Sequence, residues 1–175
     1  MRQRRLKRLG SDGPQTVADL SSLCGGRAND MAVDPAGGAY IGNFGFDMMG
    51  RAKADTTRLI RVDPDGSARA VGDELMFPNG IALIEDGRRL VVAETYANRL
   101  TMFDVAENGD LSNQRVFAQF GEDVAPDGIS AAPDGTIWVA TARDDRCVRV
   151  RDGGVIVAAV KIGAGNTYAC MLGGP

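Results

Sequence analysis

The chain has 175 residues and a nearly balanced charge, with 20 lysines and arginines against 23 aspartates and glutamates, for a formal net charge of −3. This balance provides no general attraction for nucleic acid or for an anionic membrane surface. No apolar stretch has the length of a signal-peptide core or a membrane-spanning helix. We therefore expect a cytoplasmic protein with neither nucleic acid nor membrane as a partner.

The residue types that are missing or few restrict the chemistry further. The chain contains no histidine, which excludes a Ser-His-Asp triad, a Cys-His dyad and a histidine-ligated zinc. Cys24, Cys147 and Cys170 are odd in number and lack CxxC spacing, which indicates free thiols. Any hydrolysis must depend on carboxylates and amides, with or without a metal ion.

Two kinds of hairpin alternate along the chain. RRLKRLGSDGPQTV at 4–17 is a hairpin of the outer kind, and further outer hairpins are RLIRVDPDGSARAV, RLTMFDVAENGDLSNQRVF and RCVRVRDGGVIVAAV. The inner kind begins with Asn or Asp, as in NDMAVDPAGGAYIGN, NGIALIEDGRRLVVAET and DGISAAPDGTIWVAT, which start at Asn29, Asn79 and Asp127. Short apolar runs joined by a glycine-containing turn predict β-hairpins, because such turns require φ > 0.

The repeating unit is therefore four short strands, spaced by 50 and then 48 residues. About 40–50 residues is the size of a propeller blade. We predict an all-β fold, a β-propeller of about three and a half blades. It begins in the outer half of one blade, contains two nearly complete further blades and most of another, and closes with Ala169 to Gly174 as the first strand of one more. Residues 1–175 are thus predicted to be one partial domain, truncated at both ends.

Propellers shield their sheet edges by closing a ring. An open set of blades exposes apolar faces that a neighbouring blade would cover. We therefore expect self-association through exposed blade edges.

The loop that enters the innermost strand of each propeller blade lies at one mouth of the central channel. The polar residues at or beside this position are Arg27, Asn29, Asp30, Asn79 and Asp127. Oxygen-rich clusters of Asn and Asp suit hard divalent cations. Asn-Gly and Asp-Gly are also common turn sequences, and a purely structural blade turn would repeat in the same way. The pattern alone therefore predicts a propeller with a polar axial mouth.

Two neighbouring stretches are assigned secondary roles. Glu94 and Thr95 follow a predicted strand and could reach the mouth, but assignment to an exposed blade loop is favoured. The glycine-containing loop that carries Phe44 and Phe46 is a candidate for shaping the pocket.

Several long motifs resemble one known family. GRANDMAVDPAGGAYIGNFGFD, FPNGIALIEDGRRLVVAETYANRLTMFDV, APDGISAAPDGTIWVATARDDRCVRV and the closing ACMLGG resemble the senescence marker protein/gluconolactonase/regucalcin family, over essentially the whole chain. The resemblance implies part of a six-bladed propeller that binds one divalent cation on its axis. It also implies hydrolysis of sugar lactones or related cyclic esters.

The resemblance carries roles over to particular positions. Asn79 in FPNG resembles a metal ligand, and Asp127 in APDG resembles a metal ligand that also acts as the general base. The residues that resemble the substrate-binding group are Arg27, Asn29, Asp30 and Asp47. Calcium is the expected cation, with zinc, magnesium and manganese as alternatives. The family's remaining ligand is a glutamate in a first blade that this chain does not include, which puts metal retention in question.

We therefore predict a gluconolactonase-like hydrolase of carboxylic ester (lactone) bonds, with a small lactone as its substrate. The cation would polarise the lactone carbonyl while Asp127 takes a proton from the attacking water. Arg27 and Asn29 would orient the ring hydroxyls. The alternative is a non-catalytic propeller fragment that binds calcium or a partner protein, because folds do not fix functions.

Overall fold

The computed structural model describes residues 4–173. Within this range, fourteen strands form four antiparallel sheets, which confirms the all-β prediction. The only helices in the described range are single 3₁₀ turns, η1 (Glu85–Gly87) and η2 (Thr95–Ala97). None of the helices in the described range is long or apolar enough to cross a membrane.

Each sheet consists of strands that follow one another in the chain. The two-stranded sheet contains β1 (Arg5–Gly10) and β2 (Gly13–Asp19). The next sheet contains β3 (Ala28–Val33), β4 (Ala39–Asn43), β5 (Thr57–Val62) and β6 (Ala68–Leu75). The middle sheet contains β7 (Pro78–Ile84), β8 (Arg89–Glu94), β9 (Arg99–Val105) and β10 (Leu111–Gln119). The last sheet contains β11 (Pro126–Ala131), β12 (Ile137–Thr141), β13 (Arg146–Val150) and β14 (Ile156–Lys161).

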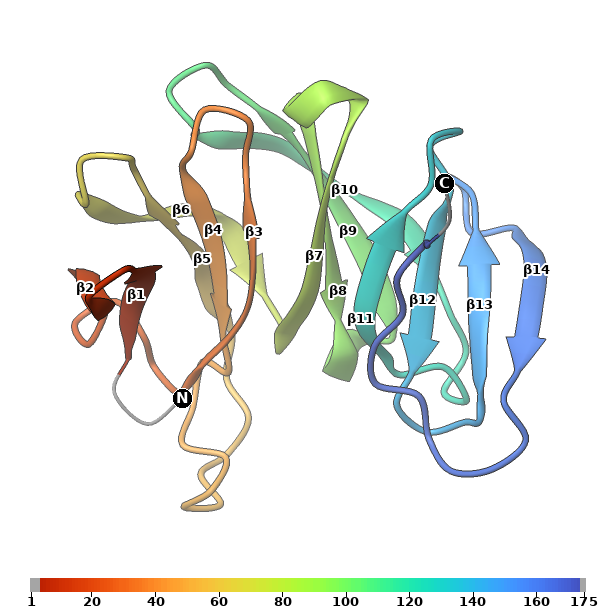
Figure 1. The fold of residues 1–175 in the computed structure, drawn as a ribbon. Coiled ribbons are helices and arrows are strands. Elements are labelled where there is room, and N and C mark those ends of the chain that lie inside the picture. Colours follow the sequence, from red (N-terminus) through yellow and green to blue (C-terminus); the bar gives the residue numbers. More distant parts are fainter. Residues whose placement is uncertain (1–3, 174–175) are drawn as a thin grey trace.

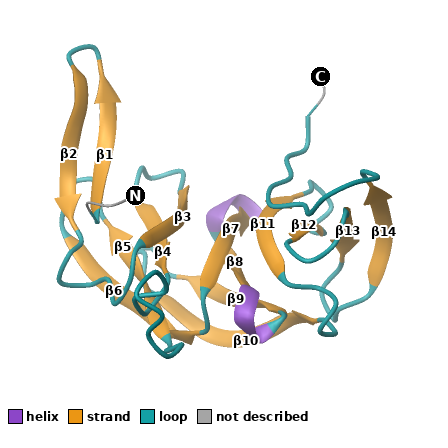
Figure 2. Ribbon diagram, turned by 90° about the horizontal axis from the view of Figure 1, so that it is seen from below, coloured by secondary structure: helices purple, strands orange, loops and turns teal. Residues whose placement is uncertain are grey.

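The sheets stand side by side as propeller blades do. In Figure 1 the first strands of the three larger sheets, β3, β7 and β11, are neighbours at the centre. The view at 90° shows the sheets following one another along an arc, with these three strands on its inner side (Figure 2). We refer to β3, β7 and β11 as the inner strands.

Apolar side chains between successive sheets hold the arc together. One core joins the β1–β2 hairpin to the β3–β6 sheet through Leu20 and Ile60. A second packs that sheet against the middle one, and a third packs the middle sheet against the last. The residues at the centres of these two cores, Tyr40, Leu90, Val91 and Ile137, are completely buried. Burial of such side chains stabilises a fold by about 1.5–3 kcal/mol each.

The local sequence explains the hairpin turns. Gly37 and Gly135 have φ of +88° and +79° in the β3–β4 and β11–β12 turns, a conformation that glycine adopts without steric cost. The β7–β8 turn is made by η1 instead, in which Glu85 and Asp86 take positive φ.

One sheet of two strands and three sheets of four strands confirm the prediction of about three and a half blades, and all three larger sheets have their four strands. One detail of the predicted organisation was wrong. The described part of the predicted last strand, 169–173, is not a strand, and Gly174 lies outside the described residues. This segment runs beside β11, since the Gly128 amide donates to the Tyr168 carbonyl at 3.0 Å.

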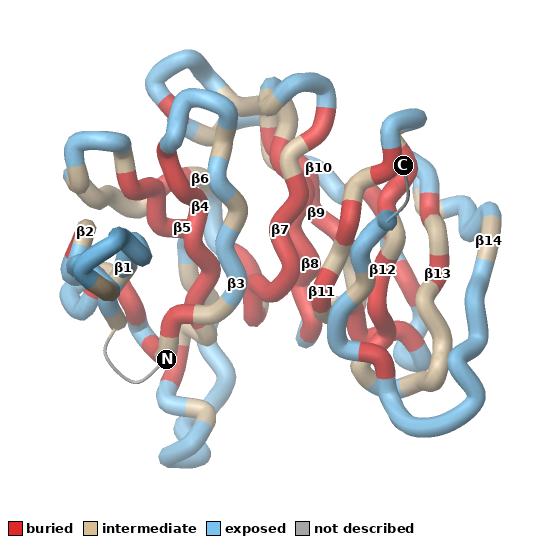
Figure 3. The backbone as a smooth tube through the Cα atoms, viewed as in Figure 1, coloured by how far each residue is buried: buried red, intermediate tan, exposed pale blue. Residues whose placement is uncertain are grey.

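Strand β14 is mostly exposed (Figure 3), and several of the exposed residues on it and beside it are large and apolar. Ile156, Val157, Val160 and Ile162 are between 39 and 57% exposed. We expect the chain to self-associate through this face, because exposed apolar strands recruit further strands or sheets. The double substitution Val157→Lys/Val160→Lys should lower the sedimentation coefficient at high protein concentration. Val116→Lys, at a β10 position exposed to 46%, is the matched control and should not. A monomer at all concentrations in the unsubstituted chain would contradict the prediction.

Candidate functional site

Each inner strand begins with the same backbone irregularity. The pairing with the second strand shifts by one residue between Ala28 and Met31 in β3, between Pro78 and Ile81 in β7, and between Pro126 and Ile129 in β11. Such a shift is a β-bulge, which adds one residue to a strand and changes the direction of the side chains there. The bulges contain Asn29, Asn79 and Asp127. These three residues therefore occupy the same structural position in successive sheets.

Backbone hydrogen bonds just outside the bulges have the same register. The residue after each second strand donates its amide to the residue two positions before the bulge residue: Phe44 to Arg27 at 3.0 Å, Thr95 to Phe77 at 3.2 Å, and Ala142 to Ala125 at 2.8 Å. This repeated bond places the three bulge residues at one end of the inner strands. The predicted convergence of Asn29, Asn79 and Asp127 thus has a geometric basis in the structure.

Side chains at this end also connect each inner strand to the next. Asn29 Nδ2 donates to the Pro78 carbonyl at 3.3 Å. Asn79 Nδ2 donates to Thr95 Oγ1 at 3.2 Å, and Thr95 Oγ1 donates to the Pro126 carbonyl at 2.7 Å. The chain of contacts runs from β3 through β7 to β11. Any molecule bound at this end therefore contacts residues whose positions depend on each other.

The carboxyl groups of this site have perturbed acidities. The pKa of Asp127 is raised from 3.8 to about 6, chiefly by burial and then by the nearby charge of Asp30. The Asn79 amide and the Gly128 backbone N–H act in the opposite direction. Burial also raises the pKa of Asp30. No cationic side chain within the described range is among the groups that act on either carboxyl.

Two partly desolvated carboxylates without a positive partner fit a cation. Asp127 and Asn79 offer oxygen atoms, the donors preferred by hard divalent ions. Residues 4–173 contain no group of three or more Asp, Glu, His or Cys side chains placed to hold a metal. Calcium takes roughly six to eight oxygens, so water or substrate would have to complete the coordination around these two residues.

The remaining predicted site residues differ in how they lie. Arg27 is half-buried, and its guanidinium forms no hydrogen bond or ion pair with any described residue, so it is available to a ligand. Asp30 is exposed as a residue on β3, but its carboxyl is partly desolvated, and its charge acts on Asp127. Asp47 is also exposed, and its carboxylate accepts the Gly50 amide at 3.0 Å within its own loop. Within residues 4–173, no hydrogen bond or ion pair joins the Asp47 carboxylate to another predicted site residue.

Sequence reasoning misplaced Glu94 and Thr95. Both are buried and not on an exposed loop. Glu94 is completely inaccessible, where Arg99 pairs with it at 2.6 Å and the Met76 amide donates to it at 2.7 Å. Several polar partners of these two side chains, namely Met76, Asn79 and Pro126, are more than ten residues away in the sequence, so the local sequence shows no sign of their burial. The one available signal was the repeat, which aligns Thr95 with Phe44 and Ala142 at the mouth.

A column of aromatic rings borders the site. Phe77 stacks on Phe44 at 4.6 Å and on Tyr96 at 4.4 Å between ring centroids, with Phe46 alongside. Phe77 has a φ of +57°, which costs about 1–3 kcal/mol for a residue other than glycine. Two stacked contacts of about 0.5–1.5 kcal/mol each are of similar size. The column therefore holds the strained turn that leads into Asn79, and it includes both loop residues predicted to shape the pocket.

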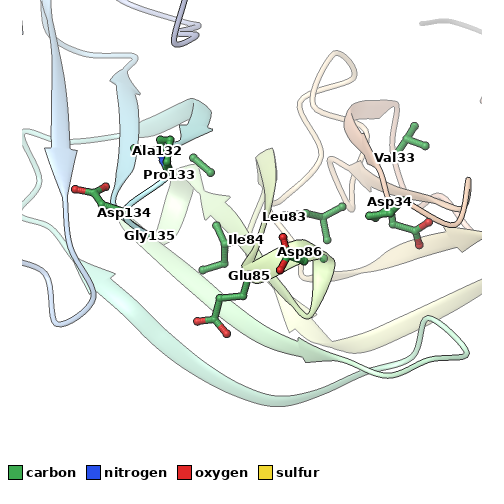
Figure 4. A pocket seen from close by; sticks show the side chains of 13 residues that line it. Val33, Asp34, Leu83, Ile84, Glu85, Asp86, Ala132, Pro133, Asp134 and Gly135 are labelled. Atoms are coloured by element: carbon green, nitrogen blue, oxygen red, sulfur yellow. The ribbon is translucent and has the colours of Figure 1, made fainter.

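A cavity of about 970 Å³ lies at the opposite end of the inner strands, among the turns at 33–35, 83–87 and 131–135 (Figure 4). None of the predicted site residues lines it. Three of its four acidic side chains already pair with arginines: Asp34 with Arg61, Glu85 with Arg89 and Asp134 with Arg149. The end that carries Asn79 and Asp127 is consequently the better cation site.

The repeated four-stranded sheets, arranged along an arc with β3, β7 and β11 on its inner side, define part of a β-propeller. The sequence profile described as "SMP-30/Gluconolactonase/LRE-like region" matches residues 5–175. The chain therefore belongs to this family.

Individual relatives agree with the family assignment. The chain is 29% identical to regucalcin of Danio rerio over 161 residues, which cover 90% of this chain and 54% of the relative. It is 28% identical to pentonolactonase XacC of Haloferax volcanii over 151 residues, or 85% of this chain and 50% of that protein. The crystal structure of a calcium-binding protein, regucalcin, from Agrobacterium tumefaciens superposes with a TM-score of 0.83 at 23% identity, covering 99% of this chain and 59% of that one. The chain thus spans about half the length of the curated relatives it matches.

The perturbed carboxyl group leads to a stability prediction for the metal-free chain. Because the folded-state pKa of Asp127 lies above 3.8, its ionised form destabilises the fold above about pH 6, and the penalty vanishes below 3.8. Asp127→Asn should therefore raise the free energy of unfolding at pH 7 by about 1–2 kcal/mol, which is less than the ~1.4 kcal/mol per pKa unit would give, because solvent screens this partly exposed side chain. Urea denaturation with a chelator present measures this change.

Asp134 is the control, because Thr136 and Arg149 lower its pKa to about 2. The ionised form of Asp134 therefore stabilises the fold above pH 3.8, and Asp134→Asn should lower the urea midpoint at pH 7. Equal effects of the two substitutions would show that Asp127 carries no electrostatic penalty.

Proposed function

We propose that this chain forms part of a divalent-cation-dependent hydrolase of sugar lactones or related cyclic esters, with Asp127 as the general base. The observation that carries the proposal is the shared bulge position of Asn29, Asn79 and Asp127, together with the uncompensated carboxyls of Asp127 and Asp30. A purely structural turn has no need to place a second carboxylate where it raises the pKa of the first.

The names of relatives support the substrate class and the cation. The family description includes gluconolactonase, and one relative is a pentonolactonase. Another is described as a calcium-binding protein. We therefore propose a lactone of a sugar acid as the substrate and calcium as the first cation to test, with magnesium, manganese and zinc as alternatives.

Each site residue has a proposed role. Asn79 and Asp127 would hold the cation through side-chain oxygens. When bound, the cation supplies Lewis-acid polarisation of the lactone carbonyl. The Asp127 carboxylate would accept a proton from the attacking water. Arg27, Asn29 and Asp30 would bind ring hydroxyls, since they surround the same mouth and Arg27 has no partner in the described range. Asp47 would bind substrate only at the outer edge of the site, because its exposed carboxylate already accepts the Gly50 amide within its own loop.

Cation binding is the first test of the proposal. Calorimetric titration of the chelator-treated chain with Ca²⁺, Mg²⁺, Mn²⁺ and Zn²⁺ should show one site. Asn79→Ala should weaken that site at least tenfold, because it removes an oxygen donor and no charge. Asp134→Ala, which removes a carboxylate at the far end of the same sheets, should leave affinity unchanged. Equal affinity in Asn79→Ala and the unsubstituted chain would remove Asn79 from the site.

Lactone hydrolysis is the second test. Release of acid from glucono-1,5-lactone and from a five-carbon sugar lactone should depend on the added cation. Asp127→Ala should lower the rate by about 100-fold or more, the usual contribution of a general base. Unchanged turnover in Asp127→Ala would exclude the assigned base. Cation binding without hydrolysis of either lactone would instead favour a non-catalytic calcium-binding role.

A further inference from the structure

Thr95 occupies an unusual place between two sheets. It is 7% exposed, and it follows β8 directly. Its hydroxyl contacts the Asn79 amide of its own sheet at 3.2 Å and the Pro126 carbonyl of the next sheet at 2.7 Å. The Thr95 hydroxyl therefore contacts Asn79 directly, and it also contacts Pro126, the residue that precedes Asp127. Both residues of the proposed cation site are thus linked to one hydroxyl.

The hydrogen atoms at this hydroxyl can be assigned by elimination. A threonine hydroxyl has one hydrogen, and a proline carbonyl can only accept. The hydroxyl hydrogen of Thr95 must therefore point to the Pro126 oxygen. Oγ1 then presents only lone pairs to Asn79, so the Asn79 amide must turn its NH₂ group toward Thr95. Its Oδ1 receives no hydrogen bond from any described residue and remains available to a ligand.

We propose that Thr95 is a positioning residue that fixes the Asn79 side-chain amide with its oxygen free for the cation. The inference rests on the proposed function in naming a cation as the ligand. Without the Thr95 acceptor, the hydrogen bond that distinguishes the nitrogen of the Asn79 amide from its oxygen is lost, and the amide can turn by 180°. An amide turned that way presents hydrogens where the cation needs oxygen.

The other two sheets support this assignment. In β3, Asn29 has no hydroxyl neighbour, because Phe44 stands at the equivalent position, and its NH₂ group donates directly to the Pro78 carbonyl. In β11 the bulge residue is an aspartate, whose two oxygens are alike and need no orientation. The equivalent position there is Ala142, which has no hydrogen-bonding side chain. Asn29 and Asn79 thus each have an acceptor for their NH₂ group. Asp127, which has no NH₂ group to orient, has no such neighbour at the equivalent position.

The orientation itself can be tested in the metal-free protein. We expect the Asn79 side-chain NH₂ resonances to show slow exchange with solvent and a nuclear Overhauser contact to the Thr95 methyl group. Thr95→Val should accelerate that exchange at least tenfold, and Thr95→Ser should preserve the slow exchange. Fast exchange in the unsubstituted chain, or equal exchange in Thr95→Val, would overturn the proposal whether or not any cation binds.

Titration with Mn²⁺ or Ca²⁺ alone tests the consequence. Thr95→Val should weaken binding about tenfold, within the range found for residues that orient metal ligands, and Thr95→Ser should stay within about twofold of the unsubstituted chain. Thr136→Val is the matched control, because it removes a buried hydroxyl at the opposite end of β12 and should leave affinity unchanged. Equal losses in Thr95→Val and Thr136→Val would reduce Thr95 to a packing role.

A double substitution separates positioning from general destabilisation. In Asn79→Asp the side chain has two equivalent oxygens, so turning it by 180° changes nothing. Adding Thr95→Val to this variant should therefore reduce the cation affinity by less than threefold. A loss of tenfold in both backgrounds would overturn the proposal, since additive effects indicate independent sites. If the unsubstituted chain binds no cation, the proposed function fails, and the amide-exchange experiment still decides the role of Thr95.

Discussion

The close approach of the inner strands at one end is the constraint on which the rest of the structure depends. A Cβ atom on Gly80 would lie 2.5 Å from the Asp127 carbonyl oxygen, and one on Gly128 would lie 2.8 Å from that of Tyr168. Real side chains do not tolerate such contacts, so only glycine permits this spacing. Because β7 and β11 meet this closely beside their bulges, the polar residues there share one small volume. The apolar cores between the sheets then fix the angle at which the strands meet.

The site combines features that oppose stability with others that support it. Asp127 and Asp30 disfavour each other's charge, and Phe77 has a strained backbone. Aromatic stacking and the hydrogen bonds of Thr95 counteract these costs at the same end of the sheets. Strain and unpaired charge that persist inside a well-packed structure are typical of binding sites.

Much of the fold could be predicted from the sequence, because its signals are local. Paired apolar runs and glycine turns indicated β4, β8 and β12, and the repeat gave the common position of Asn29, Asn79 and Asp127. Features that depend on distant partners could not be predicted. The buried Glu94 carboxylate accepts the Met76 amide from the end of the preceding sheet, and the buried Thr95 hydroxyl donates to the Pro126 carbonyl of the next sheet. The local sequence also does not show that the Asp47 carboxylate accepts the Gly50 amide within its own loop, and the role of Asp47 at the site stays a prediction.

The recurring bulge also bears on how such a site can diversify. Its geometry is fixed by main-chain bonds such as those from Thr95 to Phe77 and from Ala142 to Ala125, in which the bulge side chains take no part. The same backbone slot accordingly carries asparagine twice and aspartate once. Duplication of a blade thereby adds another equivalent bulge position at the same end of the sheets. Substitution of the side chain at one such position can then change ligand preference while the backbone stays the same.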